Sequence, residues 1–305
     1  MRRSWCPPMS ATSSRRPTMR GWFCCAWCPT DRRPRVSARA IRCVLLILPA
    51  ALALPAAAQD GVNFAVFGDN RGGKDGLQPE VFPRLVRQMA ALNPEFVIGT
   101  GDYIYGAGSQ DTLRYQWNEF FRAMAPLQDR KPTYFVPAPG NHEIAGGAGN
   151  ALFVQYFRRL YFSFDRGGSH FIILNTEVPG QESRIADQQR IWLKKDLAAA
   201  ANAAHIFIAL HRPFYPVGAH RGDSLDMYPT ERDGLHRIFA QHRVTCVFAG
   251  HEHLYNRQTR DGVTYIITGG GGAPLYAEPE DGGFYHFLSV KADRLGYNID
   301  VIRVQ

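Results

Sequence analysis

Cysteine is almost absent from most of this chain. Five of the six cysteines lie in the first 58 positions, so that Cys246 alone remains in the 247 residues from 59 to 305. A single cysteine excludes an intrachain disulfide in that part, and its place in an apolar run is typical of a small buried hydrophobic side chain. The stability of residues 59–305 must therefore come from a hydrophobic core, and the segment is long enough to form a large one.

An excess of one charge is also missing beyond residue 58. The chain has 35 Lys and Arg against 27 Asp and Glu, but ten of these arginines and one acid lie in residues 1–58, which leaves 25 basic and 26 acidic residues. The net charge of the whole chain therefore comes from its first segment. A near-neutral balance in residues 59–305 gives no case for binding to nucleic acid or to a membrane surface.

No apolar run reaches the length of about 20 residues that a membrane-spanning helix needs. The run from Val44 to Leu54 is followed by Ala56-Ala57-Ala58-Gln59 and preceded by arginines. A basic flank, a short apolar core and an Ala-x-Ala motif predict a secretory signal peptide with an upstream leader in residues 1–58. The leader indicates either a start codon placed too early or a disordered extension. We expect residues 59–305 to form a single domain of a periplasmic or secreted protein.

The spacing of apolar residues predicts a chain of alternating strands and helices. Strand-like runs at 62–68, 96–100 and 133–137 are separated by segments with helical spacing. Further along we expect a hairpin at 161–175, helices at 185–197 and about 230–242, and strands at 204–210, 244–249, 263–268, 284–290 and 297–304. No linker or repeat interrupts this pattern, which favours an α/β domain with mixed sheets and helices outside.

Five short polar motifs stand directly after strand-like runs. They are Gly68-Asp69, Gly101-Asp102, Gly140-Asn141-His142-Glu143, Ala209-Leu210-His211 and Gly250-His251-Glu252-His253. In open α/β sheets ligands bind beyond the carboxyl ends of the strands, so motifs that are distant in sequence can converge there. Carboxylate, amide and imidazole groups gathered in this way predict a two-metal centre that cleaves phosphoesters.

In this order the motifs resemble the blocks of the calcineurin-like metallophosphoesterases: Asp-x-His, Gly-Asp-x-x-Asp, Gly-Asn-His-Asp/Glu, a lone His and Gly-His-x-His. The resemblance implies a four-layer α/β/β/α sandwich with two mixed β-sheets. It also implies one metal ion bound by Asp69, Asp102 and His253, and a second bound by Asp102, Asn141, His211 and His251. These ligands suit Fe, Zn or Mn, and two such ions can activate a hydroxide held between them.

Two positions depart from the general family pattern. Arg71 stands where the first block has its histidine, and a guanidinium that stays protonated cannot ligate a metal. Tyr105 stands three residues after Asp102, where the purple acid phosphatases of the same superfamily carry a tyrosinate that binds ferric iron. The resemblance therefore implies that Tyr105 fills the vacancy at the first metal. The run Asn70-Arg71-Gly72-Gly73 is closer to a bacterial, exported subgroup, so a Zn or Mn pair stays open beside ferric iron.

Two side chains are candidates for contact with a substrate. His142 resembles the family histidine that contacts the phosphate and helps to protonate the leaving group. Arg71 is a candidate clamp for a phosphate oxygen, and a salt bridge that only positions a loop is the equal alternative. We expect a small phosphorylated substrate. Hydrolysis of phosphomonoesters is the first hypothesis, a phosphodiesterase or nucleotidase is the second, and a non-catalytic binder with a decayed metal site is the third.

Other residues near the motifs receive structural interpretations. We interpret His220 as a solvated loop residue and Gly269–Gly272 as a tight loop lining the site. Glu143 and Glu252 are expected to support the site rather than bind metal. The histidines within strand or helix patterns are expected to be surface or hydrogen-bonded core residues, namely His170, His205, His236, His242 and His286.

Overall fold

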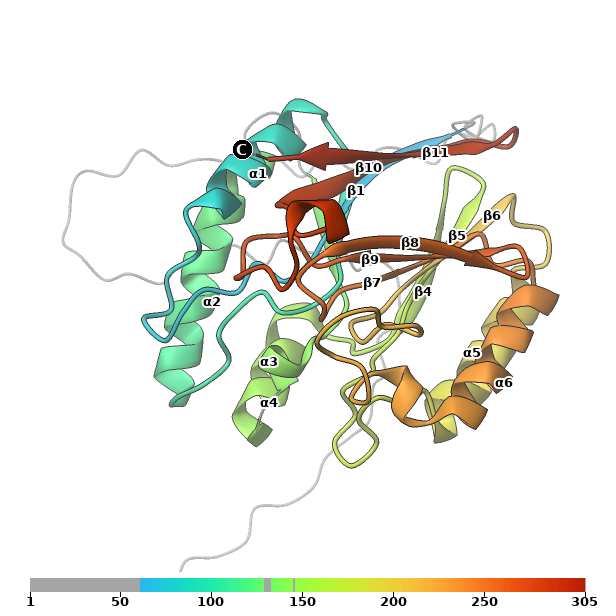
Figure 1. Cartoon of the computed structure of the whole chain (residues 1–305), viewed down its shortest axis with the longest axis horizontal. Helices are drawn as coiled ribbons and strands as arrows, with labels where there is room; N and C mark the ends of the chain where they lie inside the picture. Colours follow the sequence, from blue (N-terminus) through green and yellow to red (C-terminus); the bar gives the residue numbers. More distant parts are fainter. Residues whose placement is uncertain (1–60, 129–132, 145, 305) are drawn as a thin grey trace, which may run out of the picture. The chain divides into compact units, whose positions relative to one another are not determined.

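The computed structural model of this protein describes residues 61–128, 133–144 and 146–304. In this part of the chain two β-sheets lie between two layers of helices, with α1 and α2 on one side and α5 and α6 on the other (Figure 1). The predicted α/β/β/α arrangement with two mixed sheets is therefore confirmed. The predicted signal peptide and leader lie outside the described residues, and the boundary at residue 58 stays a prediction.

The first sheet has five strands in the order β11-β10-β1-β2-β3. Their bounds are Val62–Phe67 for β1, Phe96–Gly99 for β2, Tyr134–Pro137 for β3, His286–Ala292 for β10 and Tyr297–Arg303 for β11. β1, β2 and β3 run parallel, whereas β10 is antiparallel to both β1 and β11. The carboxyl ends of the three parallel strands therefore share one edge of the sheet.

The second sheet has six strands in the order β4-β5-β6-β7-β9-β8. Their bounds are Phe162–Arg166 for β4, Ser169–Ile173 for β5, His205–Ala209 for β6, Cys246–Ala249 for β7, Tyr255–Arg260 for β8 and Val263–Thr268 for β9. The four inner strands run parallel, and the edge strands β4 and β8 pair antiparallel with them. The predicted hairpin corresponds to β4 and β5.

Helices cover the outer faces of both sheets. The longer ones are α1 (Val81–Ala91), α2 (Gln110–Met124), α4 (Gly146–Phe157), α5 (Asp187–Ala199) and α6 (Pro229–Gln241). The short ones are α3 (Asn141–Ile144) and the 3-10 turns η1 (Ala125–Gln128), η2 (Leu225–Met227) and η3 (Pro279–Asp281). None of the helices in the described ranges has the length and apolar character needed to cross a membrane.

The space between the sheets is filled mainly by aromatic and branched side chains. The ring of Phe64 in β1 lies 5.2–5.3 Å, centroid to centroid, from the rings of Phe96, Phe171 and Phe207. Cys246 is buried in the same core, as expected from its apolar surroundings. Because both sheets contribute to this core, it fixes the strand ends of one sheet against those of the other.

Apart from α3 and the three 3-10 turns, two elements of the described residues were not predicted from the sequence. The strand β8 lies at an edge of its sheet and its sequence is Tyr-Asn-Arg-Gln-Thr-Arg, so it lacks an apolar run. The helix α4 contains Gly146, Gly147 and Gly149, and glycine is a poor helix former. Burial of Leu152 and Phe153 in the core against α2 stabilises this helix in spite of its glycines.

His170 in β5 is a buried histidine held between two carboxylates. Its Nδ1 lies 2.6 Å from Asp165 Oδ1, and its Nε2 lies 2.9 Å from Asp196 Oδ2. Ionised carboxylates only accept, so both ring nitrogens donate and the ring is protonated in this arrangement. Burial lowers the pKa of His170, but the bonds to Asp196 and Asp165 outweigh it, so the pKa lies above its ordinary value. His170 is thus a hydrogen-bonded core residue, as expected.

A pH-dependent contribution to stability follows from the raised pKa of His170. The stabilisation is complete below the pKa of the unfolded chain, about 6.5, and is lost as the pH rises through the pKa of the folded state. We expect His170→Gln to lower the free energy of unfolding more at pH 5.5 than at pH 9, as measured by urea denaturation. His242→Gln, at the end of α6, is the control. An equal loss from His170→Gln at both pH values would contradict the protonated pairing.

Candidate metal centre

Five strand ends meet at one polar centre. Asp69 follows β1, Asp102 follows β2, Asn141 follows β3, and His211 and His251 follow β6 and β7. His253 lies two residues further along. Two groups each bring their possible ligand atoms within 4.8 Å of one another: Asp69, Asp102 and His253, and Asp102, His211 and His251. The predicted convergence of the motifs is therefore present, while the role of these side chains as metal ligands stays a prediction.

Three of the side chains stand on left-handed backbone. The φ angles of Asp69, Asp102 and His251 are 60°, 59° and 70°. A non-glycine residue in this region costs on the order of 1–3 kcal/mol and persists only where its surroundings hold it. The N–H of Asp69 donates to the Gly101 carbonyl at 3.0 Å, and the N–H of His251 donates to the Asp69 carboxylate at 2.9 Å. Residues of the centre and its flanking turn thus hold the strained backbone in place.

Glu143 braces the turn that carries Asp102. Its buried carboxylate accepts backbone N–H groups from Asp102 at 2.8 Å, Tyr103 at 2.7 Å and Gly140 at 2.9 Å. Burial, and next the charge of Asp102, raise the pKa of Glu143 to about 8. Because its oxygens are occupied by backbone donors, Glu143 supports the site, as expected.

Glu252 braces a loop of the second sheet through backbone hydrogen bonds, as Glu143 does for the first sheet. Its buried carboxylate accepts the N–H groups of Val217 at 2.9 Å, Gly218 at 2.8 Å and His220 at 3.0 Å. These bonds fix the segment after β6 beside the His-x-His motif that contains Glu252. The expectation that Glu252 supports the site is also confirmed.

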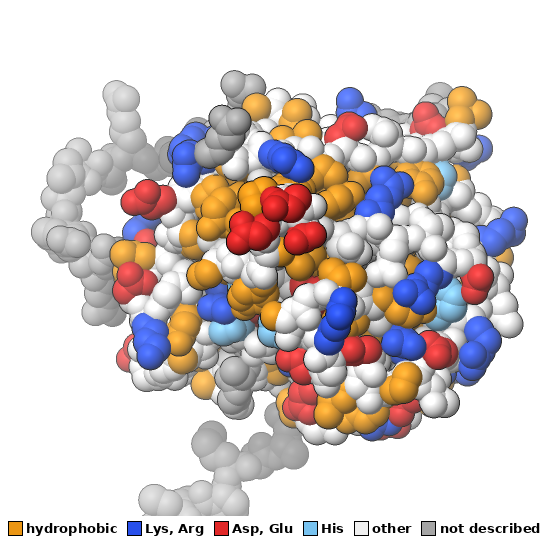
Figure 2. Space-filling model, viewed as in Figure 1, with side chains coloured by type: hydrophobic (Ala, Val, Ile, Leu, Met, Phe, Trp, Pro, Cys, Tyr) orange, Lys and Arg blue, Asp and Glu red, His pale blue; other side chains and the backbone are white. Residues whose placement is uncertain are grey.

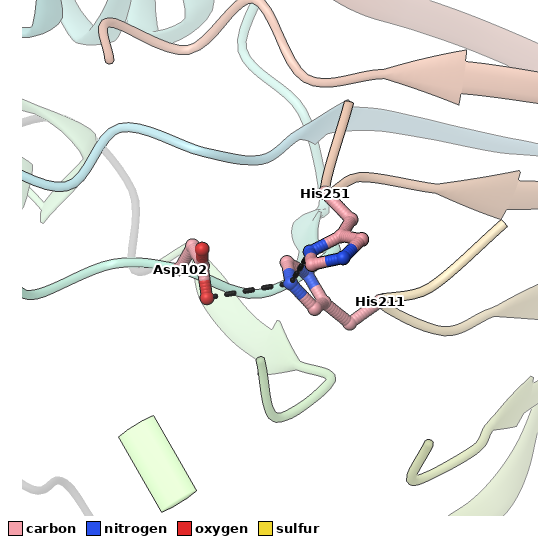
Figure 3. A group of neighbouring side chains, drawn as sticks. All are labelled: Asp102, His211 and His251. Atoms are coloured by element: carbon pink, nitrogen blue, oxygen red, sulfur yellow. Dashed lines mark hydrogen bonds and ion pairs between the residues drawn. The ribbon is translucent and has the colours of Figure 1, made fainter. Parts of the chain in front are cut away.

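The tautomer of His211 leaves a lone pair facing the centre. Its Nδ1 donates to the carbonyl of Thr100 at 2.8 Å, so Nε2 carries no proton in the neutral ring. This Nε2 lies 3.1 Å from His251 Nδ1 and 3.4 Å from Asp102 Oδ1 (Figure 3). It also lies 2.8 Å from Asn141 Oδ1. Several groups that can ligate a metal thus converge on one point.

His253 presents a second lone pair on the other side of the centre. Its Nδ1 donates to the Pro274 carbonyl at 2.6 Å. Its Nε2 is buried without a hydrogen-bond partner in the described part of the chain and lies 3.7 Å from Asp69 Oδ1. Burial lowers the pKa of His211, His251 and His253 to about 4 each, so the three rings are neutral at neutral pH. Neutral imidazole is the form that binds metal.

The two aspartates place negative charge where water is excluded. Burial, followed by the charge of Asp102, raises the pKa of Asp69 well above its ordinary value. Burial alone would also raise the pKa of Asp102, but His211 and His142 lower it below the ordinary value. Cations between the carboxylates and the imidazole lone pairs would relieve this repulsion and satisfy the unpartnered nitrogen. The residues present therefore fit a dinuclear metal site.

The predicted substrate-binding residues lie beside Asp102. His142 donates from Nδ1 to the Tyr105 carbonyl at 2.5 Å, and its Nε2 lies 3.7 Å from Asp102 Oδ2. Arg71 Nε lies 3.8 Å from the same oxygen and has no hydrogen-bond partner among the described residues. The ring of Tyr105 packs beside that of His142, 5.9 Å between centroids. His142 and Arg71 therefore border the centre, Tyr105 packs against His142, and the phenolate of Tyr105 as a metal ligand stays a prediction.

The interpretation of His220 as a solvated loop residue is correct for the loop, but the side chain is only 23% exposed and packs against the centre. Its ring lies 3.8 Å, centroid to centroid, from the ring of His251, and its Nδ1 lies 3.0 Å from Asp223 Oδ2. His220 follows His211 in an irregular loop that has no periodic pattern, so only the docking of that loop reveals its place. Asp223, which also contacts His251 Nε2 at 3.3 Å, was missed for the same reason.

The glycine-rich loop lines the centre, as expected. The Pro274 carbonyl accepts from His253, and the ring of Tyr276 stacks on that of His253 at 4.0 Å. A Cβ atom at Gly269 would lie 2.0 Å from the Glu252 carbonyl oxygen, so only glycine fits there. The loop therefore approaches the His-x-His motif closely without forming a nucleotide-binding turn.

A comparison with known protein families identifies the family of this chain. The family model described as calcineurin-like phosphoesterase matches residues 62–255, which contain all five motifs. The chain belongs to the calcineurin-like phosphoesterase family. Among the solved structures, a dimetal phosphatase from Danio rerio superposes with a TM-score of 0.54 at 14% identity, covering 79% of this chain and 98% of that one. This likeness shows a shared fold.

Curated relatives of this calcineurin-like phosphoesterase are phosphatases by name. Purple acid phosphatase 23 of Arabidopsis thaliana is 31% identical over 190 residues, which are 57% of this chain and 39% of the relative. Tartrate-resistant acid phosphatase type 5 of Homo sapiens is 26% identical over 218 residues, which are 61% of this chain and 64% of the relative. The matches to the plant purple acid phosphatases span about a third to a half of their lengths.

Metal stoichiometry tests the two groups of ligands. We expect the purified protein to bind two Zn²⁺ or Mn²⁺ ions, and His251→Ala to lose the ion near His211 because one imidazole lone pair is removed. Equilibrium dialysis with elemental analysis measures the ratio. His236→Ala is the matched control, because His236 bonds Tyr265 and Asp261 away from the centre. Retention of two ions at unchanged affinity in His251→Ala would show that this nitrogen is not a ligand.

Proposed function

We propose that this protein is an exported, metal-dependent phosphoesterase that hydrolyses phosphomonoesters, like an acid phosphatase. The observation that carries the proposal is the convergence of imidazole lone pairs from His211 and His253 on the buried carboxylates of Asp102 and Asp69. Two relatives are named as acid phosphatases, and these names support a phosphomonoester as the substrate.

The strand ends would hold two ions in fixed positions. Asp69, Asp102 and His253 would hold the first, with Tyr105 as the proposed further ligand, and Asp102, Asn141, His211 and His251 would hold the second. When bound, the ions supply activation of a water molecule and neutralisation of charge on the phosphoryl oxygens. Most of the geometry is set by short backbone turns at the strand ends, which favours fixed distances between the ligands.

His142 is the proposed source of a proton for the leaving group. The bond from Nδ1 to the Tyr105 carbonyl fixes the ring, so that Nε2 faces the centre beside Asp102. The side chain is 23% exposed, so the ring can exchange protons with solvent. Its protonated Nε2 would donate to the oxygen of the departing alcohol, which is general acid catalysis.

Arg71 is the proposed clamp for a phosphoryl oxygen. Its guanidinium approaches Asp102, and its buried Nε–H has no hydrogen-bond acceptor among the described residues. An unpaired buried donor is costly, and a bound phosphoryl oxygen would satisfy it. The same cation also offsets part of the negative charge of the two aspartates, so the loop-positioning role and the clamp are compatible.

The proposed substrate is small, and the proposed location is the periplasm or the medium. On the face shown in Figure 2, Lys and Arg side chains are interspersed with Asp and Glu. This mixture and the near-neutral charge beyond residue 58 support a small phosphorylated molecule over a nucleic acid. The predicted signal peptide in residues 1–58 supports export.

Turnover of p-nitrophenyl phosphate tests the proposed activity. We expect the metal-loaded protein to hydrolyse it, Asn141→Ala to abolish turnover, and His142→Ala to lower kcat by roughly 10²–10⁴-fold with both ions retained, because His142 is the proposed proton donor and not a metal ligand. Parallel assays with bis-p-nitrophenyl phosphate and a 5′-nucleotide measure the preference. No turnover at any pH with both ions bound would reject hydrolysis and favour a binding protein.

The visible absorption spectrum tests whether Tyr105 binds ferric iron. If Tyr105 binds ferric iron, the purified protein will show a tyrosinate-to-iron charge-transfer band that Tyr105→Phe abolishes, because phenylalanine has no oxygen to donate. Tyr103→Phe is the matched control, since the Tyr103 hydroxyl donates to the Ala138 carbonyl at 2.8 Å in the core. A colourless, active zinc or manganese protein would exclude the ferric assignment and leave the phosphoesterase intact.

A further inference from the structure

Arg212 forms a buried ion pair beside the centre. It follows His211 directly, and its Nε donates to the two carboxylate oxygens of Glu177 at 2.8 and 3.0 Å. The side chains are 13% and 2% exposed. Glu177 is itself held, because the hydroxyl of Thr176 donates to its carboxylate at 2.8 Å and its own N–H donates to Asn175 Oδ1 at 2.7 Å. The guanidinium therefore has a fixed anchor after β5.

The other end of the guanidinium reaches the loop that follows β6. The NH1 group of Arg212 donates to the backbone carbonyl of Asp223, and the hydroxyl of Ser183 donates to the same carbonyl at 2.6 Å. Two donors from separate segments thus fix the backbone at Asp223. A buried ion pair costs desolvation energy and contributes little net stability compared with apolar side chains of the same size, so its position calls for another explanation.

The side chain of Asp223 determines which nitrogen of His251 carries the proton. Its Oδ1 lies 3.3 Å from His251 Nε2, and its Oδ2 lies 3.0 Å from His220 Nδ1. A carboxylate only accepts, so both of these nitrogens donate to it. The lone pair of His211 Nε2 is a competing acceptor, 3.1 Å from His251 Nδ1. The charged carboxylate is the stronger acceptor, so the proton lies on Nε2, and the neutral ring of His251 has its lone pair on Nδ1, facing His211. This is the tautomer that a ligand of the second metal needs.

Arg212 itself does not set this tautomer directly. Its NH1 lies 3.5 Å from His251 Nε2, but a guanidinium has no lone pair and cannot accept the Nε2 proton, whereas the carboxylate of Asp223, 3.3 Å away, can. The guanidinium can act on His251 only by holding the backbone at Asp223. The order of contacts is therefore Glu177 to Arg212, Arg212 to Asp223, and Asp223 to His251.

We propose that Arg212, anchored by Glu177, is a positioning residue for the second metal site, because it places Asp223 to fix the Nε2–H tautomer of His251 and the position of His220. The inference rests on the proposed function in that it takes the site to bind two ions. Outer partners of metal-bound histidines fix the ring and its tautomer, and their loss costs about 10–100-fold in metal affinity.

Titration of the metal-free protein with Zn²⁺ alone, followed by calorimetry, tests the proposal. We expect Arg212→Ala and Asp223→Asn to weaken one of the two sites by about 10–100-fold and to leave the other unchanged. Arg212→Lys retains the charge but lacks the guanidinium fork, so we expect it to weaken the same site. Unchanged affinity at both sites in Arg212→Ala and Asp223→Asn would overturn the proposal.

A matched ion pair elsewhere supplies the control. Arg184 donates to Glu231 at 3.0 and 2.6 Å, joining the segment before α5 to α6. Arg184→Ala removes another arginine–glutamate pair, one that has no contact with Asp223 or His251 among the described residues, so both Zn²⁺ affinities should equal those of the wild type. If Arg184→Ala weakens the same site as Arg212→Ala, the effect reflects a general loss of stability and the proposal fails.

A second measurement keeps the test decisive if Arg212→Ala does not fold. Glu177→Gln preserves the shape of the anchor and removes its charge, and ¹⁵N NMR of the histidine rings reports the tautomer of His251 without metal. We expect Nε2–H in the wild type and a mixture of tautomers in Glu177→Gln and Asp223→Asn; an unchanged tautomer in both refutes the inference. Two bound Zn²⁺ ions without turnover in the wild type would reject the proposed activity alone.

Discussion

The burial of Asp69 and Asp102 side by side is the constraint on which the rest of the centre depends. Two carboxylates in a place without water repel each other, which is why the pKa of Asp69 is raised by burial and by the charge of Asp102. A backbone N–H group and the cation of Arg71, whose Nε lies 3.8 Å from Asp102 Oδ2, offset part of this repulsion. The imidazole lone pairs that point inward add no positive charge, so the centre is arranged for cations.

The fold meets this constraint through its two sheets. Parallel strands in each sheet end at one edge, and the shared aromatic core around Phe64 fixes the two edges against each other. Glu143 and Glu252 then brace the turns with backbone hydrogen bonds, so that strained residues such as Asp102 keep their left-handed conformation. Stability and function are linked here, because the bonds that hold the turns also place the ligands.

Fold similarity alone does not establish catalysis, because a shared scaffold can serve different roles. Hydrolysis is therefore inferred from the site. In this chain the decisive details are the unpartnered Nε2 of His253 and the donor of Arg71 beside Asp102.

The sequence by itself determined the order of most strands and helices, the five motifs at strand ends, and the family to which the chain belongs. It could do so because apolar periodicity and ligand type are local properties. It did not reveal β8, α4, the docking of His220, or the path from Glu177 through Arg212 and Asp223 to His251. Those features depend on contacts between segments far apart in the chain, and the tautomer of a histidine depends on which acceptor the tertiary structure brings to each nitrogen.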